Sequence, residues 1–376
     1  MNAVVKLEPA NNGAYVKEIS GVAHSLNHHL AIFKKWMNDP NVNEISINDN
    51  PSELWIWRGD EIYKEHVAEL SYDKLETIAG LVSNFTNNPI SESNTSISGE
   101  LPDLSRIEIT IYPGCPEGSI YLNLRKHSEH SFSMADYEAQ GYFENTKHVV
   151  STKVPEAERT RLYNYLTDDE KLLYDCACKN EWVKFITLTQ ELDGFNGLIS
   201  GTMGTGKTTF LKSMIELMSP EEMIITVEDS NEIKIKKHPN NKKLFFKRGK
   251  GKDDKKVGAS PIEALRTCLR KTPNVVIYGE LRGEEAMIYI EEVANIGLNR
   301  TYSTIHANSA PSAYARLASL AKKSEEGKVL SYAEIYDIIY PVVHYVIQLK
   351  YFRNMRKRRV TEIYFDPIFN LYRTGL

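Results

Sequence analysis

Hydrophobic residues take two kinds of spacing in the first third of the chain. Over residues 22–37 they recur every three or four positions, which predicts a helix, and residues 72–85 repeat that pattern. Over residues 43–57 they alternate with polar residues on both sides of a polar turn, which predicts a β-hairpin. Residues 106–111 and 120–125 predict a second hairpin in the same way. Together these elements predict a small α+β domain.

The second half of the chain combines longer helical patterns with short, wholly hydrophobic runs. Residues 168–192 have helical periodicity. The runs at 223–227, 274–278 and 302–305 are typical of strands that are buried on both faces. Because helical segments separate these runs, we expect a parallel sheet covered by helices.

Between these two parts the periodicity is lost. Lys, Thr and Glu collect there around Pro155, so we predict an interdomain linker at residues 142–166. A chain of 376 residues is also too long for one ordinary domain. The predicted fold class is therefore α/β, with a smaller N-terminal α+β domain at residues 1–141 and a larger domain at residues 167–376.

Two segments of the larger domain are strongly basic. Residues 234–256 contain eleven Lys and Arg residues, and a solvated loop is favoured there over a patch for lipid or nucleic acid. Residues 353–359 are also basic, and we expect them to turn a terminal hairpin between 343–349 and 360–364.

The composition is that of a globular protein, with 41% hydrophobic and 26% charged residues. A formal net charge of −4 argues against a protein that stably coats nucleic acid. No run of 18 apolar residues occurs, and the first residues have no signal-peptide core. The four cysteines form no C-x-x-C pair, although Cys176 and Cys178 leave a redox or metal pair open as the less favoured alternative. We therefore expect a cytoplasmic protein.

One loop carries specific chemistry. Residues 201–208 fit G-x-x-x-x-G-K-[ST] at every fixed position, between a hydrophobic run and a helical pattern. Its glycines let backbone N–H groups surround phosphates, and the helix N-terminus adds its positive dipole end. Lys207 would reach the β- and γ-phosphates, and the Thr208 hydroxyl would bind Mg²⁺. The sequence thus predicts an ATP site in a RecA-like P-loop NTPase domain. The expected nucleotide-binding residues are Gly201, Thr202, Met203, Gly204, Thr205, Gly206, Lys207, Thr208 and Thr209.

Polar residues follow the predicted strands of this domain. Glu228 ends the run at 223–227, Glu280 follows the run at 274–278, and His306 follows the run at 302–305. The carboxyl ends of parallel strands are where such a sheet places groups that face a bound nucleotide. All three are therefore candidates for the chemistry.

Taken together, these motifs resemble the hexameric traffic ATPases of bacterial type IV secretion and conjugation systems, part of a wider superfamily of secretion and pilus motors. In the larger domain the resemblance is carried by four boxes in order, at residues 201–208, 226–232, 269–286 and 303–308. In the smaller domain the matching segments are 43–55, 101–103 with Arg106, 123–125 and 131–133.

The resemblance implies roles for individual residues. Glu280 would polarise the attacking water or hold it through Mg²⁺, and Glu228 competes for that role. Mg²⁺ would be held by Thr208, Glu228 and Glu280, partly through water. His306 would sense the γ-phosphate. Arg106 and Arg125, otherwise ordinary strand-end residues, match family arginines that face the phosphates, so both are candidate arginine fingers.

The resemblance also implies a homohexamer that contacts other subunits of a type IV secretion system at the cytoplasmic face of the inner membrane. It would energise pilus assembly or the transfer of DNA or protein. The alternatives are a type II secretion or pilus motor and, less favoured, a DNA-translocating motor.

Some positions depart from the family pattern. The family has Gly-His-x-Gly where this chain has Gly297-Leu-Asn-Arg300, and a turn glycine where it has Leu104. Asn274 replaces an Asp, and Met203 replaces a small polar residue. The long linker leads to the hypothesis that domains exchange between neighbouring subunits.

Overall fold

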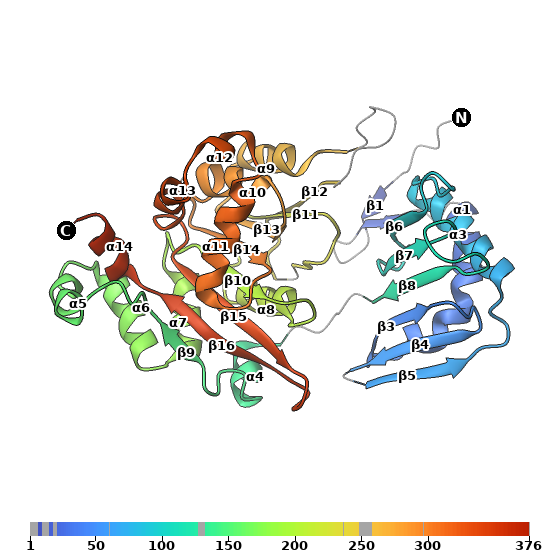
Figure 1. Cartoon of the computed structure of the whole chain (residues 1–376), viewed down its shortest axis with the longest axis horizontal. Coiled ribbons are helices and arrows are strands. Elements are labelled where there is room, and N and C mark those ends of the chain that lie inside the picture. Colours follow the sequence, from blue (N-terminus) through green and yellow to red (C-terminus); the bar gives the residue numbers. More distant parts are fainter. Residues whose placement is uncertain are drawn as a thin grey trace. The chain divides into compact units, whose positions relative to one another are not determined.

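The computed structural model describes residues 7–9, 15–17, 21–59, 61–126, 132–235, 237–247, 258–295 and 297–375. The chain divides into two compact units, Met1–Glu129 and His130–Leu376 (Figure 1). Near the N-terminus, β1 (Leu7–Pro9) and β2 (Tyr15–Lys17) form a two-stranded antiparallel sheet.

The first unit is built on a six-stranded antiparallel sheet in the order β5-β4-β3-β8-β7-β6. Its strands are β3 (Val42–Ile47), β4 (Glu53–Arg58), β5 (Glu61–His66), β6 (Ser96–Glu100), β7 (Arg106–Thr110) and β8 (Tyr121–Arg125). Both predicted hairpins form, as β3–β4 and β7–β8. Alternate residues such as Ile107 and Ile109 are buried, which follows from the period-two pattern of the sequence.

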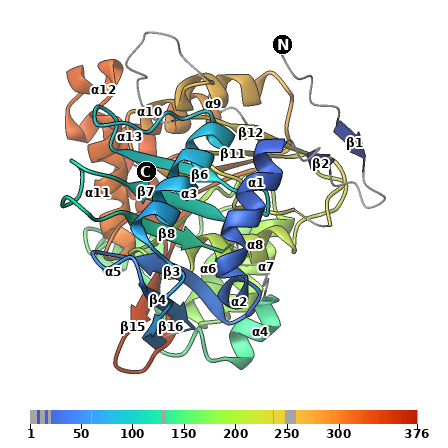
Figure 2. The same ribbon diagram turned by 90° about the vertical axis from the view of Figure 1, so that its right-hand side faces the viewer.

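Helices cover one face of this sheet. The predicted first helix forms as α1 (Gly21–Leu30), the short η1 (Ala31–Phe33) and α2 (Lys34–Met37). The second is α3 (Tyr72–Thr86), which begins where the Ser71 side chain accepts a hydrogen bond from the Lys74 backbone. Figure 2 shows α1 and α3 side by side across the sheet.

The second unit contains an eight-stranded sheet in the order β12-β11-β13-β14-β10-β15-β16-β9. Its strands are β9 (Lys147–Val149), β10 (Gly197–Gly201), β11 (Ile224–Glu228), β12 (Asn241–Phe245), β13 (Val275–Leu281), β14 (Arg300–Ile305), β15 (Tyr345–Phe352) and β16 (Lys357–Phe365). All neighbours are parallel except β15 and β16, which form the predicted terminal hairpin. From β15 to β11 the neighbouring strands are all parallel, in agreement with the predicted RecA-like sheet.

Two hydrophobic cores lie on opposite faces of the large sheet. Adjacent residues of β10, Leu198 and Ile199, enter different cores, because successive side chains of a strand point to opposite faces. The helices of this unit are α4 (Met134–Ala139), α5 (Glu156–Tyr163), α6 (Asp168–Cys178), α7 (Trp182–Glu191), α8 (Lys207–Ile215), α9 (Pro261–Leu269), α10 (Glu285–Ile288), the π-helical η2 (Tyr289–Val293), α11 (Ala310–Ala321), α12 (Glu325–Val329), α13 (Tyr332–Ile339) and α14 (Pro367–Arg373). Within the described residues, no helix is both long and apolar enough to cross a bilayer.

The segment predicted as a linker, residues 142–166, has regular structure. It contains β9, which adds a parallel strand to β16, and the whole of α5. The hydrophobic pattern did not predict α5 because one of its two buried residues is polar. Arg159 is only 8% exposed and forms a bidentate ion pair with Asp366, at 3.0 and 2.9 Å. Of the basic segment 234–256, the structure describes residues 234–235 and 237–247, and the prediction for the rest lies outside the described residues.

The Arg159–Asp366 pair gives a prediction about stability. We expect Arg159→Ala to lower the free energy of unfolding of the second unit by about 3–5 kcal/mol, because it leaves a buried carboxylate unpaired. Urea unfolding would measure this. Arg161→Ala is a matched control on the same helix, since its pair with Glu158 is exposed to solvent and its loss should have a much smaller effect. Equal effects of the two variants would contradict the prediction.

Candidate functional site

The glycine-rich loop joins the end of β10 to the start of α8. Gly204 and Gly206 have φ of 76° and 89°, a left-handed conformation that side-chain-bearing residues rarely adopt. This geometry ends the strand and begins α8 at Lys207, so that free backbone amides collect at the helix N-terminus. Thr202, Met203 and Gly204 are exposed at the loop surface, where a phosphate chain can reach them.

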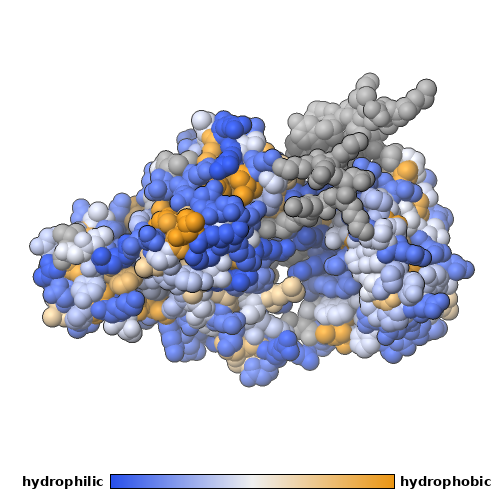
Figure 3. All heavy atoms as spheres, turned by 45° about the horizontal axis from the view of Figure 1, so that its top comes forward, coloured by the Kyte–Doolittle hydropathy of each residue, from blue (hydrophilic) through white to orange (hydrophobic). Residues whose placement is uncertain are grey.

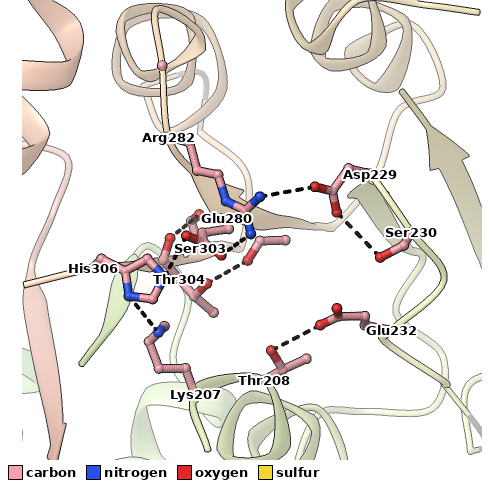
Figure 4. A network of polar contacts seen from close by, with 12 residues as sticks. Lys207, Thr208, Asp229, Ser230, Glu232, Glu280, Arg282, Ser303, Thr304 and His306 are labelled. Carbon is pink, nitrogen blue, oxygen red and sulfur yellow. Dashed lines mark hydrogen bonds and ion pairs between the residues drawn. The ribbon is translucent and has the colours of Figure 1, made fainter. Parts of the chain in front are cut away.

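Lys207 is buried, with 8% of its surface exposed. Its ammonium group donates to the backbone carbonyls of Gly201 at 2.9 Å and Thr202 at 3.2 Å. The same Nζ lies 3.2 Å from His306 Nδ1 (Figure 4). A buried cation of this kind needs anionic or carbonyl partners, and phosphate oxygens can serve as such partners.

Glu280 is directed into the site by a β-bulge. In the pairing of β13 with β14, Tyr278 lies opposite Ser303 and Glu280 opposite Thr304, so Gly279 is an extra residue. Glu280 Oε1 then lies 3.0 Å from His306 Nε2. The Gly279 carbonyl accepts a hydrogen bond from the Thr304 hydroxyl at 2.7 Å, so this acceptor is satisfied at the bulge.

His306 connects Lys207 to Glu280 through its two ring nitrogens. The carboxylate favours a hydrogen on Nε2, so in the neutral ring Nδ1 keeps a lone pair that accepts from Lys207. Nδ1 also lies 3.0 Å from the Gly201 carbonyl, but in this tautomer it has no hydrogen to donate, and that carbonyl accepts from Lys207 instead. Lys207, His306 and Glu280 thus form one continuous polar chain (Figure 4).

Arg282, which the sequence analysis did not select, lies at the other end of this chain. Its guanidinium contacts Glu280 Oε2 at 2.8 Å and Asp229 Oδ2 at 3.5 Å (Figure 4). Burial works to raise the pKa of Glu280, but the hydrogen bond and charge of Arg282, helped by His306 and Lys207, outweigh it and hold that pKa below its ordinary value. Glu280 is therefore an ionised carboxylate at neutral pH.

Glu232 is a second site residue that the sequence analysis missed. Its Oε2 lies 3.5 Å from the Thr208 hydroxyl, the group expected to bind Mg²⁺. A hydroxyl with nearby carboxylates fits a hard cation that keeps several waters and takes its other ligands from phosphates. No cluster of three or more His, Cys, Asp or Glu suited to a metal occurs among the described residues.

Glu228 lies in a different environment from Glu280. It is 2% exposed, and its Oε2 accepts hydrogen bonds from the backbone amides of Glu232 at 3.0 Å and Ile233 at 2.8 Å. Burial raises the pKa of Glu228 from 4.5 to about 7, although these amides oppose the shift. This carboxyl therefore holds the backbone of the loop that follows β11.

Arg106 and Arg125 both belong to the first unit, and the sheet brings them together. They are direct cross-strand partners on β7 and β8, with Glu100 opposite Arg106 and Glu44 opposite Arg125. Two like charges directly opposite each other disfavour the pairing unless anionic groups lie close by. The register therefore places two arginines and two glutamates at neighbouring positions on these four strands.

The sequence contained signals for both missed residues. Arg282 follows Glu280 by two positions, and Glu232 follows Glu228 by four, each inside a box that already carried the resemblance. Which side chain of a box faces the loop depends on a bulge and a turn, and these appear only in the fold.

The order of the strands around β10, together with the loop at its end, defines the class: the protein is an ATP-hydrolysing P-loop enzyme with a RecA-like core. A sequence profile of the family described as "Type II/IV secretion system protein" matches residues 184–349. The X-ray structure of the Yersinia pseudotuberculosis ATPase DotB, 16% identical, superposes with a TM-score of 0.52 over 87% of this chain and 75% of DotB, which shows a shared fold.

Two relatives identify the family more narrowly. Type IV secretion system protein VirB11 of Bartonella henselae is 32% identical, over 88% of this chain and 90% of its own length. The protein of the same name from Brucella suis is 28% identical, over 92% of this chain and 91% of its own. The chain belongs to the VirB11 family, the traffic ATPases of type IV secretion systems.

The raised pKa of Glu228 predicts how stability depends on pH. Between pH 4.5 and about 7 the folded protein holds a proton that the unfolded chain has lost, so this group's contribution to stability falls as pH rises through that window. Glu228→Gln is neutral at every pH and keeps the acceptor for the two amides. We expect it to flatten this part of the profile and to raise stability at pH 8 by on the order of 2–3 kcal/mol.

Urea unfolding at four pH values from 5 to 8 would measure the difference between variant and wild type. Glu221→Gln, at an exposed position on the loop before β11, is the control and should leave the profile unchanged. A Glu228→Gln profile parallel to that of wild type would contradict the prediction.

Proposed function

We propose that this chain forms a hexameric ring that hydrolyses ATP at the loop after β10 and so powers pilus assembly or substrate transfer through a type IV secretion system. The observation that carries the proposal is the polar chain from Lys207 through His306 to Glu280 at the carboxyl ends of adjacent strands. Membership of the VirB11 family supports the system in which it acts.

Residues 201–209 are the proposed nucleotide-binding segment. The amides at the start of α8 would hold the phosphates, and Lys207 would exchange its carbonyl contacts for the β- and γ-phosphates. Mg²⁺ would be bound by Thr208, with Glu280 and Glu232 acting through water, and its charge would neutralise the phosphates. Glu228 is less suited to hold the ion, because its Oε2 is already occupied by backbone amides.

Glu280 is the proposed residue that orients the attacking water. Its carboxylate is ionised, partly exposed and aimed at the site, whereas burial keeps much of Glu228 protonated near pH 7. His306 contacts both Glu280 and Lys207, so a change at the γ-phosphate would alter both of its contacts. The geometry therefore supports a sensing role for His306.

The first unit is the proposed nucleotide-covering domain. The cross-strand pairing of Arg106 and Arg125 supports a role as arginine fingers, because arginine side chains carry the positive charge that stabilises a transferring phosphoryl group. Other subunits of a type IV secretion system and the cytoplasmic face of the inner membrane are the proposed partners, and stable binding of nucleic acid is not expected.

The role of Glu280 can be tested by ATP turnover. We expect Glu280→Gln to lower kcat by about 10²–10⁴-fold while ATP still binds, because the variant keeps the shape and loses the charge that orients water. Lys207→Ala should lose binding as well. Glu284→Gln, four residues further on and exposed, is the matched control and should keep wild-type turnover. Undiminished turnover by Glu280→Gln would refute the assignment.

The arginine fingers predict a separate result. Arg125→Ala should lower kcat by about 10³-fold or more without changing the mass of the ring, because the lost charge stabilises the transition state. Light scattering would check the assembly beside the assay. Arg58→Ala, on β4 of the same sheet, is the control and should turn over ATP normally. If Arg125→Ala is fully active, the first unit does not complete the site in the proposed way.

A further inference from the structure

The terminal hairpin reaches the phosphate-binding loop. Arg358, on β16, donates a hydrogen bond from Nε to the Gly204 carbonyl at 3.0 Å. Its Cδ would lie 3.6 Å from a Cβ atom at Gly206, so the arginine lies directly against the loop. Arg358 and Gly204 are separated by 154 positions in the sequence, and the fold alone brings them together.

The guanidinium of Arg358 is fixed from its other side by an aromatic ring. Tyr351 is its direct cross-strand partner on β15, and the guanidinium carbon lies 4.9 Å from the centre of that ring. A contact of this kind restricts the conformations of a long side chain, so the N–H donors of the guanidinium keep a defined direction. The hydrogen bond to Gly204 therefore comes from a held group.

The geometry of a peptide unit decides what this contact does. In a planar trans peptide the carbonyl of Gly204 and the N–H of Thr205 point in opposite directions. A donor that holds the carbonyl from outside thus turns the amide toward the inside of the loop, where phosphate binds. We propose that Arg358 is a positioning residue of the ATP site, which holds the Gly204–Thr205 peptide in its phosphate-binding orientation.

The same strand links the loop to the segment that opens the second unit. Next to Arg358, the Val360 amide donates to the Tyr142 carbonyl at 2.9 Å, and the Val360 carbonyl accepts from the Thr146 hydroxyl at 2.7 Å. Arg359 also pairs with Glu144 at 2.6 Å. The position of Arg358 therefore depends on residues 142–146, which follow the boundary between the two units closely.

Affinity for nucleotide tests the inference, which rests on the proposed ATP site at residues 201–209. Fluorescent analogues of ADP and ATP would be titrated into the full-length protein. We expect Arg358→Ala to raise both Kd values by the same factor, about five- to tenfold, since the loop amide contacts a phosphate group that both nucleotides have. The kcat at saturating ATP should change less than about twofold. Arg358→Lys keeps a hydrogen-bond donor but loses the planar guanidinium. Its Kd values should lie between those of wild type and Arg358→Ala.

Arg353→Ala is the matched control, because this arginine lies exposed in the turn of the same hairpin. It should bind both analogues as wild type does. Unchanged Kd values for Arg358→Ala would overturn the inference, and so would a loss confined to ATP, which would mean a direct contact with the γ-phosphate. If wild type itself binds neither analogue, the proposed ATP site fails, which is a different result.

A double-mutant cycle tests the link to residues 142–146. Thr146→Val removes the hydrogen bond to the Val360 carbonyl and should weaken both nucleotides in the same direction as Arg358→Ala, by a smaller factor. In the Arg358→Ala background it should have no further effect, because the group through which it acts is absent. Additive losses would show that Thr146 acts by another route. Thermal unfolding of each variant checks that its fold is intact.

Discussion

A buried ammonium group organises the proposed site. Lys207 is 8% exposed, and a cation so removed from water is tolerated only where acceptors surround it. Two loop carbonyls and His306 Nδ1 supply them. The other ring nitrogen of His306 contacts Glu280, and Glu280 in turn forms an ion pair with Arg282. The negative charge of Glu280 thus lies between the positive charges of Arg282 and Lys207, and both favour its ionised form.

This arrangement explains why binding and catalysis can be coupled. Phosphate oxygens are stronger partners for an ammonium group than backbone carbonyls, so at the proposed ATP site a nucleotide would compete for Lys207 with the protein's own acceptors. A shift of Lys207 would remove its contact with His306 Nδ1 and so change the environment of the ring that contacts Glu280. The carboxylate that orients water in our proposal therefore responds to the same event that fills the site. Arg282 would restrict the movement of Glu280, because it donates a hydrogen bond to Oε2, the carboxylate oxygen that does not contact His306.

The sequence predicted those parts of the fold that local patterns encode. The P-loop was predictable because its conformation depends on glycines a few residues apart, and the strands around it because runs such as 274–278 are hydrophobic throughout. The regular structure of residues 142–166 was not predictable from local patterns. Both β9 and α5 are held by partners more than 200 positions away, among them Asp366 for Arg159. The Glu228 and Glu280 alternatives also could not be separated by sequence, because burial and a bulge give two glutamates different environments.

The departure at Arg300 shows how the chain adjusts to an unusual residue at the start of β14, the strand that ends next to His306. Where the family pattern has a glycine, Arg300 is 2% exposed and would be costly without partners. It has them in Glu222 and in the Leu192 carbonyl at 3.0 Å, which come from outside β14. The start of β14 is therefore anchored on two sides, and its six buried residues lead directly to His306. The contacts of Arg300 therefore stabilise the strand from which His306 extends, although they lie at its opposite end.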